Sequence, residues 1–324
     1  MSVNLRYISS TTGETFYFQA SNPVKTKTAN FHNYAWTPRA FYFEYGAEVQ
    51  GFGKSPLTYN MEMWLSGAKS ARVQWLDKFH SACDLDITNM TPGRLYWEDM
   101  YIECFIISTS TYPAEGNMRT VNDISVFAPY PSWIYERTFS NSHTESEVIW
   151  LLVELDSFDA AQTPFDYISG YGNFHAPFEA LPSDFRVVLI GDSQESDPAY
   201  ATIKTELYNV MTSVAVDSIT EISFPNLYLQ TGECLVVDSR VNHKTARVYD
   251  LKTVSGHTVI DSENFENVYS ERAAEAHIFK KMKFGAMPNA NHSLIEIADC
   301  YSVYGNSLIV TGYFERSEPK WISS

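Results

Sequence analysis

A glycine-rich stretch in the first quarter of the chain carries the residue types with which proteins hold phosphate groups. It reads Gly51-Phe-Gly53-Lys54-Ser55, and in a phosphate-binding loop the backbone amides and the lysine surround the phosphates at a helix start. That motif requires another glycine at position 48, where this chain has Glu48, and Pro56 with an alternating strand pattern follows in place of a helix. The stretch is therefore predicted to be a structural turn, and no cofactor is expected.

Four candidate metal ligands follow one another closely at His80, Cys83, Asp84 and Asp86. Helical spacing can place the His80 imidazole and the Cys83 thiolate on one side of a helix, but the third and fourth ligands that a metal site needs on that side are missing. The plainer interpretation puts His80 near the carbonyl end of a helix. The other histidines form neither a His-x-x-x-His nor a His-Glu-x-x-His pattern: His32, His143, His175, His243, His257, His277 and His292. No metal site is predicted.

The sequence contains no specific motif of a hydrolase either. No Gly-x-Ser-x-Gly elbow is present to hold a strained nucleophile. Asp156 with Asp159, or Glu145 with Glu147, could be imagined as glycosidase carboxylates, but such pairs arise freely in an acidic chain and sequence does not give their separation. A solvated face is the simpler interpretation. The chain is not predicted to be an enzyme.

The length and the composition indicate two β-rich domains. At 324 residues the chain exceeds the usual size of a single core. Aromatic residues make up 15% of it, and they favour pleated, half-buried surfaces and oligomer interfaces. Stacking on sugars is another use for them, but aromatics spread evenly along a chain more often fill cores and subunit interfaces.

The net charge of −16 is unevenly distributed. Residues 1–142 hold 11 Lys and Arg against 13 Asp and Glu, a net −2, whereas residues 143–324 hold 12 against 26, a net −14. An acidic surface repels phosphate backbones and anionic lipid headgroups, so nucleic acid and membranes are not expected as ligands of the second half. A generic solubility surface explains the acidity at least as well as an electrostatic role.

Cysteine usage indicates a reducing compartment. Cys83, Cys104, Cys234 and Cys300 are widely spaced and form no Cys-x-x-Cys, so buried thiols are expected in a protein made in a cytosol. The first residues enter a strand pattern at once, which is not typical of a signal peptide. The longest apolar run, 148–153, is too short to span a bilayer.

Alternating patterns predict strands at the start of the chain. Leu5 and Tyr7 alternate, Thr11-Thr12-Gly13 turns, and residues 15–18 return as a hairpin. The aromatic, glycine-punctuated residues 29–55 indicate a long loop or an extended hairpin arm. Residues 57–65 then alternate without a break, with Leu57, Tyr59, Met61, Met63 and Leu65 on one face.

After Gly67 the period changes to that of a helix. The predicted core face holds Ala68, Ala71, Trp75, Leu76, Phe79, Ala82 and Cys83, and the predicted polar face holds Lys69, Arg72, Gln74, Asp77, Lys78 and Ser81. A turn at Pro92-Gly93, one strand over 94–108 and another through 121–126 complete the first half.

A polar segment, 138–145, suits a connection between domains. Beyond it, short apolar runs separated by turn residues predict a β-sandwich or jelly roll. The predicted strands are 148–155, 185–190, 214–224, 234–238, 245–251, 294–297 and 308–314.

The order of these features resembles the distal tail proteins of long-tailed bacteriophages, especially those of Gram-positive hosts. The resemblance is carried by an opening hairpin, an aromatic arm, the strand that follows it, a helix led by glycine and the pieces Pro92-Gly93-Arg94-Leu95, Met100–Phe105 and Pro129-Tyr-Pro131-Ser-Trp133. The second half is similar at 163–167, 232–238, 279–282 and 316–321. It departs from the family at Phe165-Asp-Tyr167, where Tyr-Asp-Tyr is usual, and at Gly285-Ala-Met-Pro-Asn289, where Gly-x-Asn is usual.

The resemblance implies a mainly β, structural protein with two domains. An α+β, split-barrel-like domain over 1–140 would form a ring, commonly a hexamer, and a galectin-like β-sandwich over 141–324 would face outward. The ring would act as a hub in the virion tail tip or baseplate, joining the tail tube protein to a tail-tip or tail-associated protein for host attachment, and DNA would pass its channel without specific binding. The predicted subunit interface consists of Trp36, Phe41, Phe43, Tyr45 and Phe52.

The alternative is a carbohydrate-binding β-sandwich module that attaches a virion or an enzyme to a cell-wall polysaccharide. Glycan arrays separate the two hypotheses. Binding that one aromatic substitution within 145–324 abolishes, without loss of assembly, would favour the module.

Overall fold

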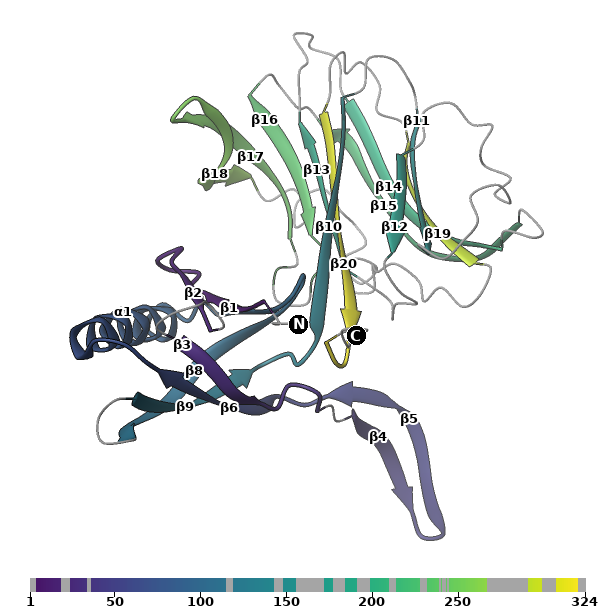
Figure 1. Ribbon diagram of the computed structural model, residues 1–324. Coiled ribbons are helices and arrows are strands. Elements are labelled where there is room, and N and C mark those ends of the chain that lie inside the picture. Colours follow the sequence, from purple (N-terminus) through teal and green to yellow (C-terminus); the bar gives the residue numbers. More distant parts are fainter. Residues whose placement is uncertain are drawn as a thin grey trace. The chain divides into compact units, whose positions relative to one another are not determined.

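The computed structural model consists mainly of β-strands, as predicted, and has one helix within the described residues (Figure 1). The structure describes residues 4–18, 24–33, 36–114, 119–142, 148–155, 172–176, 184–190, 199–209, 214–227, 232–238, 240, 243, 245–266, 291–298 and 307–319. The chain forms two compact units: unit 1 comprises Met1–Tyr135 with Arg316–Ser324, and unit 2 comprises Glu136–Glu315. The domains 1–140 and 141–324 stay a prediction.

Unit 1 contains the first elements of the chain. They are β1 (Leu5–Ile8), β2 (Thr15–Tyr17), β3 (Val24–Ala29), β4 (Trp36–Phe43), β5 (Gly46–Lys54), β6 (Leu57–Leu65), α1 (Lys69–Thr88), β7 (Gly93–Trp97), β8 (Met100–Ala114), β9 (Arg119–Ala128) and the start of β10 (Trp133–Ser142). The opening hairpin predicted from the sequence is β1 paired with β2.

The long strand β8 belongs to two sheets of unit 1. Its first residues pair with β7, which leads on to β1 and β2, and its later residues pair with β9, which leads on to β6 and β3. A register shift between Ile106 and Ser108 lies within the second pairing. Such an irregularity bends a strand and increases its twist, so one strand can turn from one sheet into the next.

Strand β6 confirms the period-two prediction. Tyr59, Met61, Met63 and Leu65 are buried, and Leu57 is half-buried at the edge of the same face. The strand lies between β3 and β9, so both of its edges are paired. A central strand with one apolar face is what the alternation requires.

Helix α1 begins after Gly67, whose φ of 94° suits glycine, and it is 20 residues long. The buried residues are Arg72, Leu76, Phe79, Ala82, Cys83 and Asp86. The prediction was therefore wrong at Arg72, which is buried, and at Ala68 and Ala71, which are exposed. The Arg72 guanidinium donates to the Thr120 hydroxyl of β9 at 2.9 Å, and this partner in another element accounts for its burial.

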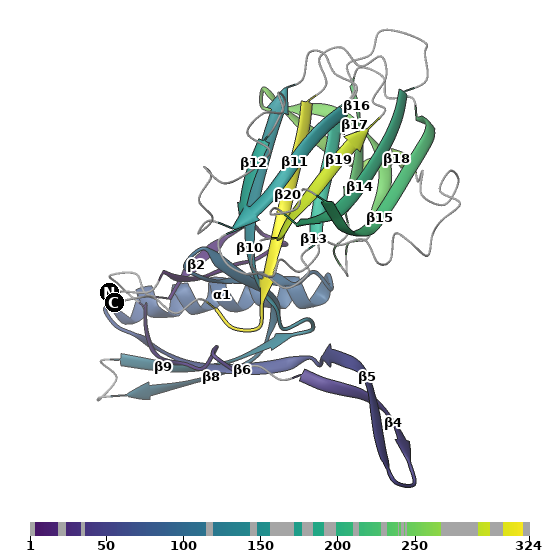
Figure 2. The same ribbon diagram turned by 90° about the vertical axis from the view of Figure 1, so that its right-hand side faces the viewer.

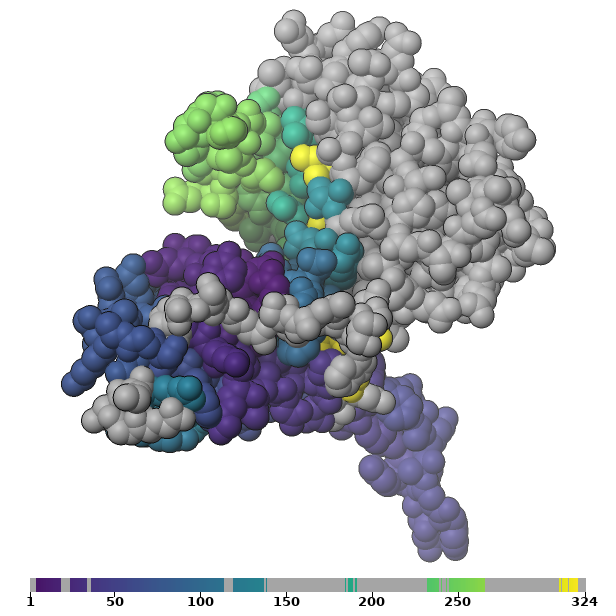
Figure 3. All heavy atoms as spheres, viewed as in Figure 1, coloured from purple at the N-terminus to yellow at the C-terminus, as the bar shows by residue number. Residues whose placement is uncertain are grey.

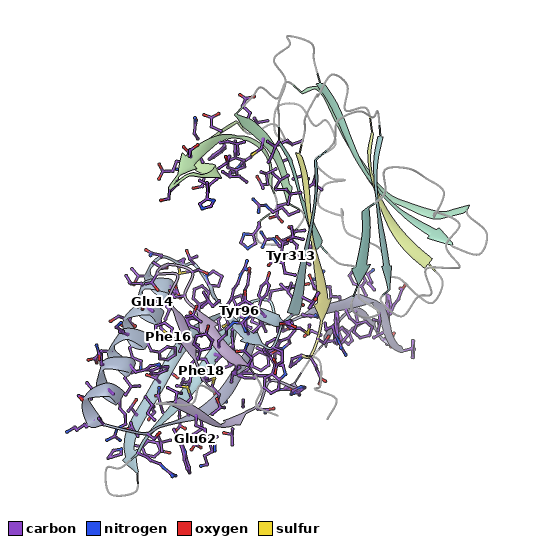
Figure 4. All side chains as sticks on the ribbon, turned by 45° about the horizontal axis from the view of Figure 1, so that its top comes forward. Glu14, Phe16, Phe18, Glu62, Tyr96 and Tyr313 are labelled. Atoms are coloured by element: carbon purple, nitrogen blue, oxygen red, sulfur yellow. The ribbon has the colours of Figure 1, made fainter. Side chains whose placement is uncertain are left out.

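Aromatic rings fill the space between α1 and the opening hairpin. Phe16 and Phe18 of the hairpin meet Phe79 edge to face at 5.3 and 5.8 Å between ring centroids, and Trp75 stacks on Phe79 at 5.0 Å. Figure 4 labels Phe16 and Phe18, which these ring contacts place against the helix. A second cluster surrounds Phe31, whose ring meets those of Tyr59, Trp97 and Trp133.

The predicted strand over 94–108 is in fact a hairpin. Strand β7 ends at Trp97, and β8 begins at Met100 after a two-residue turn in which Glu98 has a φ of 54°. Glycine or asparagine usually supplies that conformation, so the sequence carried no turn signal. Contacts with the start of the chain hold Glu98 in place: its N–H donates to the Asn4 carbonyl at 3.1 Å, and its carboxyl accepts from the Asn4 N–H at 3.0 Å.

Unit 2 contains the rest of β10 and the remaining strands. These are β11 (Val148–Leu155), β12 (Gly172–Ala176), β13 (Asp184–Ile190), β14 (Ala199–Asn209), β15 (Val214–Leu227), β16 (Glu233–Asp238), β17 (Thr245–Val254), β18 (His257–Glu266), β19 (Asn291–Ala298) and β20 (Ser307–Arg316). All seven strands predicted for this half are present. Strands β12, β14 and β18 were not predicted.

Among the described residues, the strands of unit 2 lie in two sheets (Figures 1 and 2). One has the order β18-β17-β16-β13-β20-β10 and the other the order β12-β11-β19-β14-β15. In the first sheet Val188, Cys234 and Val236 are buried, and the half-buried Ile190, Tyr249, Leu251, Ile260 and Ile309 pack against them. The β-sandwich and its galectin-like form stay predictions.

The polar segment at 138–145 was expected to connect the domains. Its first residues instead continue strand β10, which ends at Ser142. Within this strand the Thr138 hydroxyl contacts the Thr311 hydroxyl of β20 at 3.1 Å. Residues 143–147 lie outside the described part of the chain. Polar residues also occur in strands that pair with a neighbour, so the polarity of this segment did not identify it as a loop.

Candidate functional site

The hairpin of β4 and β5, called the arm below, exposes several large apolar side chains of unit 1. Its two strands pair only with each other among the described strands, with Trp36 opposite Lys54 and Phe43 opposite Gly46. Figures 1 and 3 show the arm extending away from the rest of unit 1. Of the two alternatives for residues 29–55, a long loop or an extended hairpin arm, the structure has the hairpin, and its strands occupy only 36–54.

All five residues predicted for a subunit interface lie on this arm and are exposed. They are Trp36, Phe41 and Phe43 on β4, Tyr45 in the turn and Phe52 on β5. Isolated two-stranded hairpins are marginally stable in water, and contiguous exposed apolar patches mark interaction sites. The structure brings the five residues together on one element, and their part in an interface stays a prediction.

Two further apolar residues of the arm escaped the sequence analysis. Tyr42 is 82% exposed and Val49 is 52% exposed. Tyr42 belongs to the same Phe41-Tyr-Phe43 run, so the aromatic run itself was the available signal. Val49 gave none, because one valine between Glu48 and Gln50 looks like an ordinary strand residue.

The base of the arm is fixed to the segment that precedes β10. The Lys54 ammonium donates to the buried Ser132 hydroxyl at 2.5 Å, and it lies over the rings of Trp36 and Tyr130 at 5.1 and 5.7 Å from their centroids. A cation held between two aromatic faces contributes to orienting both of them. Lys54, which resembled a phosphate ligand in the sequence, therefore makes structural contacts at the base of the arm.

The glycines of that former candidate lie in strand β5, in agreement with a structural interpretation and not with a phosphate-binding loop. Strand β6 begins at Leu57, directly after them, so no helix N-terminus follows. The prediction of a turn there was wrong in detail, because 51–54 form strand and the turn of this hairpin lies at residues 44–45.

Two of the candidate metal ligands on α1, His80 and Asp86, contact different partners. The Asp86 carboxyl accepts hydrogen bonds from the Tyr7 hydroxyl at 2.7 Å, the Ser9 hydroxyl at 2.9 Å and the Thr11 N–H at 2.8 Å. His80 contacts the Thr109 hydroxyl at 3.1 Å, and burial raises the pKa of the Cys83 thiol. Helix α1 continues to Thr88, so His80 lies within the helix and not near its end, which corrects the prediction.

The environment of Tyr7 shows how tightly this network is packed. Burial, more than any other cause, raises the pKa of its hydroxyl. Gly93 lies against the ring, and a Cβ at that position would overlap it. The glycine in the predicted Pro92-Gly93 turn is thus required for close approach to Tyr7.

The remaining candidate catalytic or metal-binding residues are cysteines without a disulfide or fall outside the residues that the structure describes. Cys83, Cys104 and Cys234 are buried and unpaired by disulfides, as predicted. Cys300 and the carboxylate pairs 145 with 147 and 156 with 159 fall outside the described residues. Within the described part, no group of three or more His, Cys, Asp or Glu side chains is arranged to hold a metal ion.

The fold of this chain matches that of solved bacteriophage tail structures. The crystal structure of the SPP1 Dit protein, described as a paradigm of the hub adsorption apparatus in phages that infect Gram-positive hosts, superposes with a TM-score of 0.50 at 8% identity, over 97% of this chain and 100% of that one. Two structures of the phage P2 baseplate in its activated conformation also match. The TM-score is 0.50 at 8% identity with Ca, over 96% and 98% of the two chains, and 0.52 at 9% identity with Sr, over 96% and 97%.

These matches define the class of fold: that of phage distal tail and baseplate proteins. The resemblance found in the sequence is confirmed at the level of the fold, end to end. Neither a family model nor a curated protein matches the sequence. Within the described ranges, no helix combines the length and apolar character that crossing a membrane requires.

Proposed function

We propose that this protein is a structural, non-enzymatic component of a phage or prophage-derived tail tip or baseplate. Its copies form a ring that acts as a hub between the tail tube and the tail-tip or host-adsorption apparatus. The observation that carries the proposal is the arm, an exposed aromatic hairpin on a chain with the fold of phage hub proteins. A contiguous exposed apolar surface of this kind marks an interaction site.

The mechanism is geometric. The arm of each copy reaches a neighbouring copy and buries Trp36, Phe41, Phe43, Tyr45 and Phe52 there. Because the arm and the surface that receives it differ, the contact is heterologous, and its repetition gives a closed ring when the rotation between copies closes. Residues 1–140 form this ring, commonly of six copies, around a channel that DNA passes without specific binding.

The charge distribution supports a ring built by the first part of the chain. Residues 1–142 carry a net −2, so identical copies can pack through them with little repulsion, while residues 143–324 carry a net −14. The acidic part, 141–324, faces outward in the virion tail tip. The partners of the ring are the tail tube protein on one side and a tail-tip, tail-associated or baseplate protein on the other.

Light scattering and electron microscopy of the purified full chain test the proposal. The chain has a mass of 36.9 kDa, so a ring of six copies would weigh about 220 kDa. Replacing residues 36–54 by a short Gly-Ser linker should abolish the ring without unfolding the units, because these residues contribute little to the core. A wild-type chain that stays monomeric at high concentration, with no rings in micrographs, would overturn the proposal.

A matched control uses another exposed hairpin, β17 with β18. Its turn at Ser255-Gly256 also carries an exposed apolar neighbour, Val254. Shortening this hairpin at its turn should leave the ring mass unchanged, because it belongs to the part of the chain that is expected to face outward.

A further inference from the structure

Strand β18 is the outermost strand of the first sheet of unit 2. Among the described strands it pairs only with β17 (Figure 1), and Figure 3 shows the hairpin of these two strands, in green, at the surface. The outer edge of such a strand presents backbone N–H and C=O groups with which a strand of another chain can pair. An exposed edge of this kind carries a risk of unwanted association.

The residues of β18 favour such pairing. Thr258, Val259 and Ile260 are β-branched and uncharged, and Val259 and Phe265 are 37% and 43% exposed. Short segments with high β-propensity, little charge and no proline are typical of strands that add to one another between chains. Proline and lysine commonly protect an edge, but neither occurs between 257 and 266. Another feature must therefore protect β18.

The middle of β18 interrupts the pairing with β17. The pairs on either side of the interruption are Tyr249 with Phe265 and Leu251 with Ile260. Between them, Asp250 alone on β17 stands opposite the four residues 261–264 of β18. A regular ladder would place one residue there, so the other three form a bulge in the edge strand. A bulge bends a strand and increases its twist, and a straight strand from outside cannot follow such an edge.

Side-chain contacts hold the bulge in one conformation. The Asp261 carboxyl accepts hydrogen bonds from the Lys252 ammonium at 2.9 Å and from the Glu263 N–H at 3.2 Å. The Asn264 amide donates to the Asp250 carboxyl. Glu263 is exposed, and a strand that paired at this edge would have to remove water from its carboxylate, which costs free energy. The bulge therefore opposes pairing both by its shape and by its charge.

We propose that the bulge at 261–264 protects the edge of unit 2, because it prevents strands of other chains, above all β18 of a second copy, from pairing with β18. Two identical edge strands can pair antiparallel about a two-fold axis, so every copy of the chain is a potential partner for every other. Copies held together in an assembly meet at a high effective concentration. The inference does not depend on the ring, and it confines association to other surfaces of the chain.

Deletion of residues 261–263 tests the inference. The deletion leaves Asn264, which already donates to Asp250, as the single residue opposite it, so that the ladder of β17 and β18 continues without a bulge. At equal concentration, light scattering on the full-length deletion variant should give at least about twice the wild-type mass, as expected when edges pair about a two-fold axis. The infrared absorption of intermolecular β-sheet should rise with this mass.

Two further variants separate the shape of the edge from its charge and from misfolding. Asp261→Asn with Glu263→Gln removes the same two charges as the deletion but keeps the bulge, so this variant should keep the wild-type mass. Thr258→Lys, added to the deletion variant, places an ammonium group at an exposed position of the edge strand and should restore the wild-type mass.

The outcomes decide the inference whether or not the ring exists, because each mass is compared with that of the wild type. A folded deletion variant with the wild-type mass would overturn it, and so would equal association of the variant that keeps the bulge. Circular dichroism and thermal unfolding show whether each variant folds. Aggregation caused by unfolding would persist after Thr258→Lys, so a failure of this substitution to restore the mass also contradicts the inference. A monomeric wild type would overturn the proposed function alone.

Discussion

Asp86 joins the end of helix α1 to the hairpin that begins the chain. It is fully buried, and its carboxyl accepts three hydrogen bonds from the hairpin. Asp86→Ala leaves these donors without their acceptor in the core, and unmet buried donors cost about 1–3 kcal/mol each. We expect the free energy of unfolding of unit 1 to fall by about 3 kcal/mol or more in urea denaturation followed by fluorescence.

The control for this experiment lies two residues earlier on the same helix. Asp84 is exposed, and Asp84→Ala should change the free energy of unfolding by no more than about 0.5 kcal/mol. Equal effects of the two substitutions would show that the helix tolerates loss of the hydrogen bonds, contrary to the structure.

Cys234 makes unit 2 sensitive to alkaline pH. Burial raises the pKa of its thiol from 9.0 to about 11, so between these values the unfolded chain releases a proton that the folded chain keeps. The stabilisation from the neutral buried thiol is complete below pH 9 and is lost as the pH rises through 11. Relative to Cys234→Ala, which cannot titrate at this position, the wild type should lose about 2–3 kcal/mol between pH 8 and pH 11.

Thermal unfolding of both proteins across this pH range measures the difference. Comparison with the alanine variant cancels the titration of every other group, including the buried tyrosines. Parallel curves for the two proteins would mean that the Cys234 thiol ionises in the folded chain as readily as in water.

At the scale of elements, period-two and helical patterns predicted most of the structure where one face is buried. Strand β6 and the seven strands of the second half were found because their apolar residues alternate or run together. Helix α1 was found, but its buried face is shifted by one residue at its start because Arg72 has a hydrogen-bond partner on β9. A local pattern does not contain such a partner.

The errors have the same physical origin. The turn at Glu98 is imposed by contacts with Asn4, 94 residues away in the sequence, and no local residue signals it. The arm was predicted as an element because aromatic and glycine residues gather in it, but its two faces became assignable only from the register of β4 and β5. A shift at Arg39 and Ala40 changes which residues share a face, and the sequence does not reveal that shift.

Lys54 fixes the base of the arm, which is a property of the element. Its ammonium lies over two rings and donates to Ser132. Lys54→Met keeps most of the side-chain volume but removes the charge, so the arm should lose its fixed direction and self-association should weaken about three- to tenfold. Lys54→Arg keeps a cation over the rings and should restore association in the same light-scattering assay.

A purely structural effect of Lys54 would produce a different result. Both variants would then lower the unfolding temperature of unit 1 to the same extent, and arginine would not rescue association. Ser132→Ala serves as a milder companion change, because it removes the hydrogen bond and leaves both ring contacts of the ammonium.

For the whole molecule, the proposed function gives the two parts of the chain different tasks, and the charge and the arm are distributed accordingly. The arm belongs to unit 1, whereas most of the net charge lies beyond residue 142. Carbohydrate binding by residues 145–324 stays a prediction from the sequence. It is independent of the ring, since a module that binds glycans can be carried by any assembly.

The salt dependence of assembly distinguishes an apolar contact from one held by ion pairs. In a ring, the −14 parts of neighbouring copies repel each other across water, and the Debye length falls from about 30 Å at 0.01 M salt to about 10 Å at 0.1 M. Because the proposed contact of the arm is apolar and the arm carries no net charge, added salt should weaken the repulsion and leave that contact intact. The dissociation constant of self-association should therefore fall at least about threefold between 0.01 and 0.3 M NaCl, measured by light scattering at pH 7. Weaker association at high salt would mean that complementary charges, and not the aromatic arm, hold the copies together.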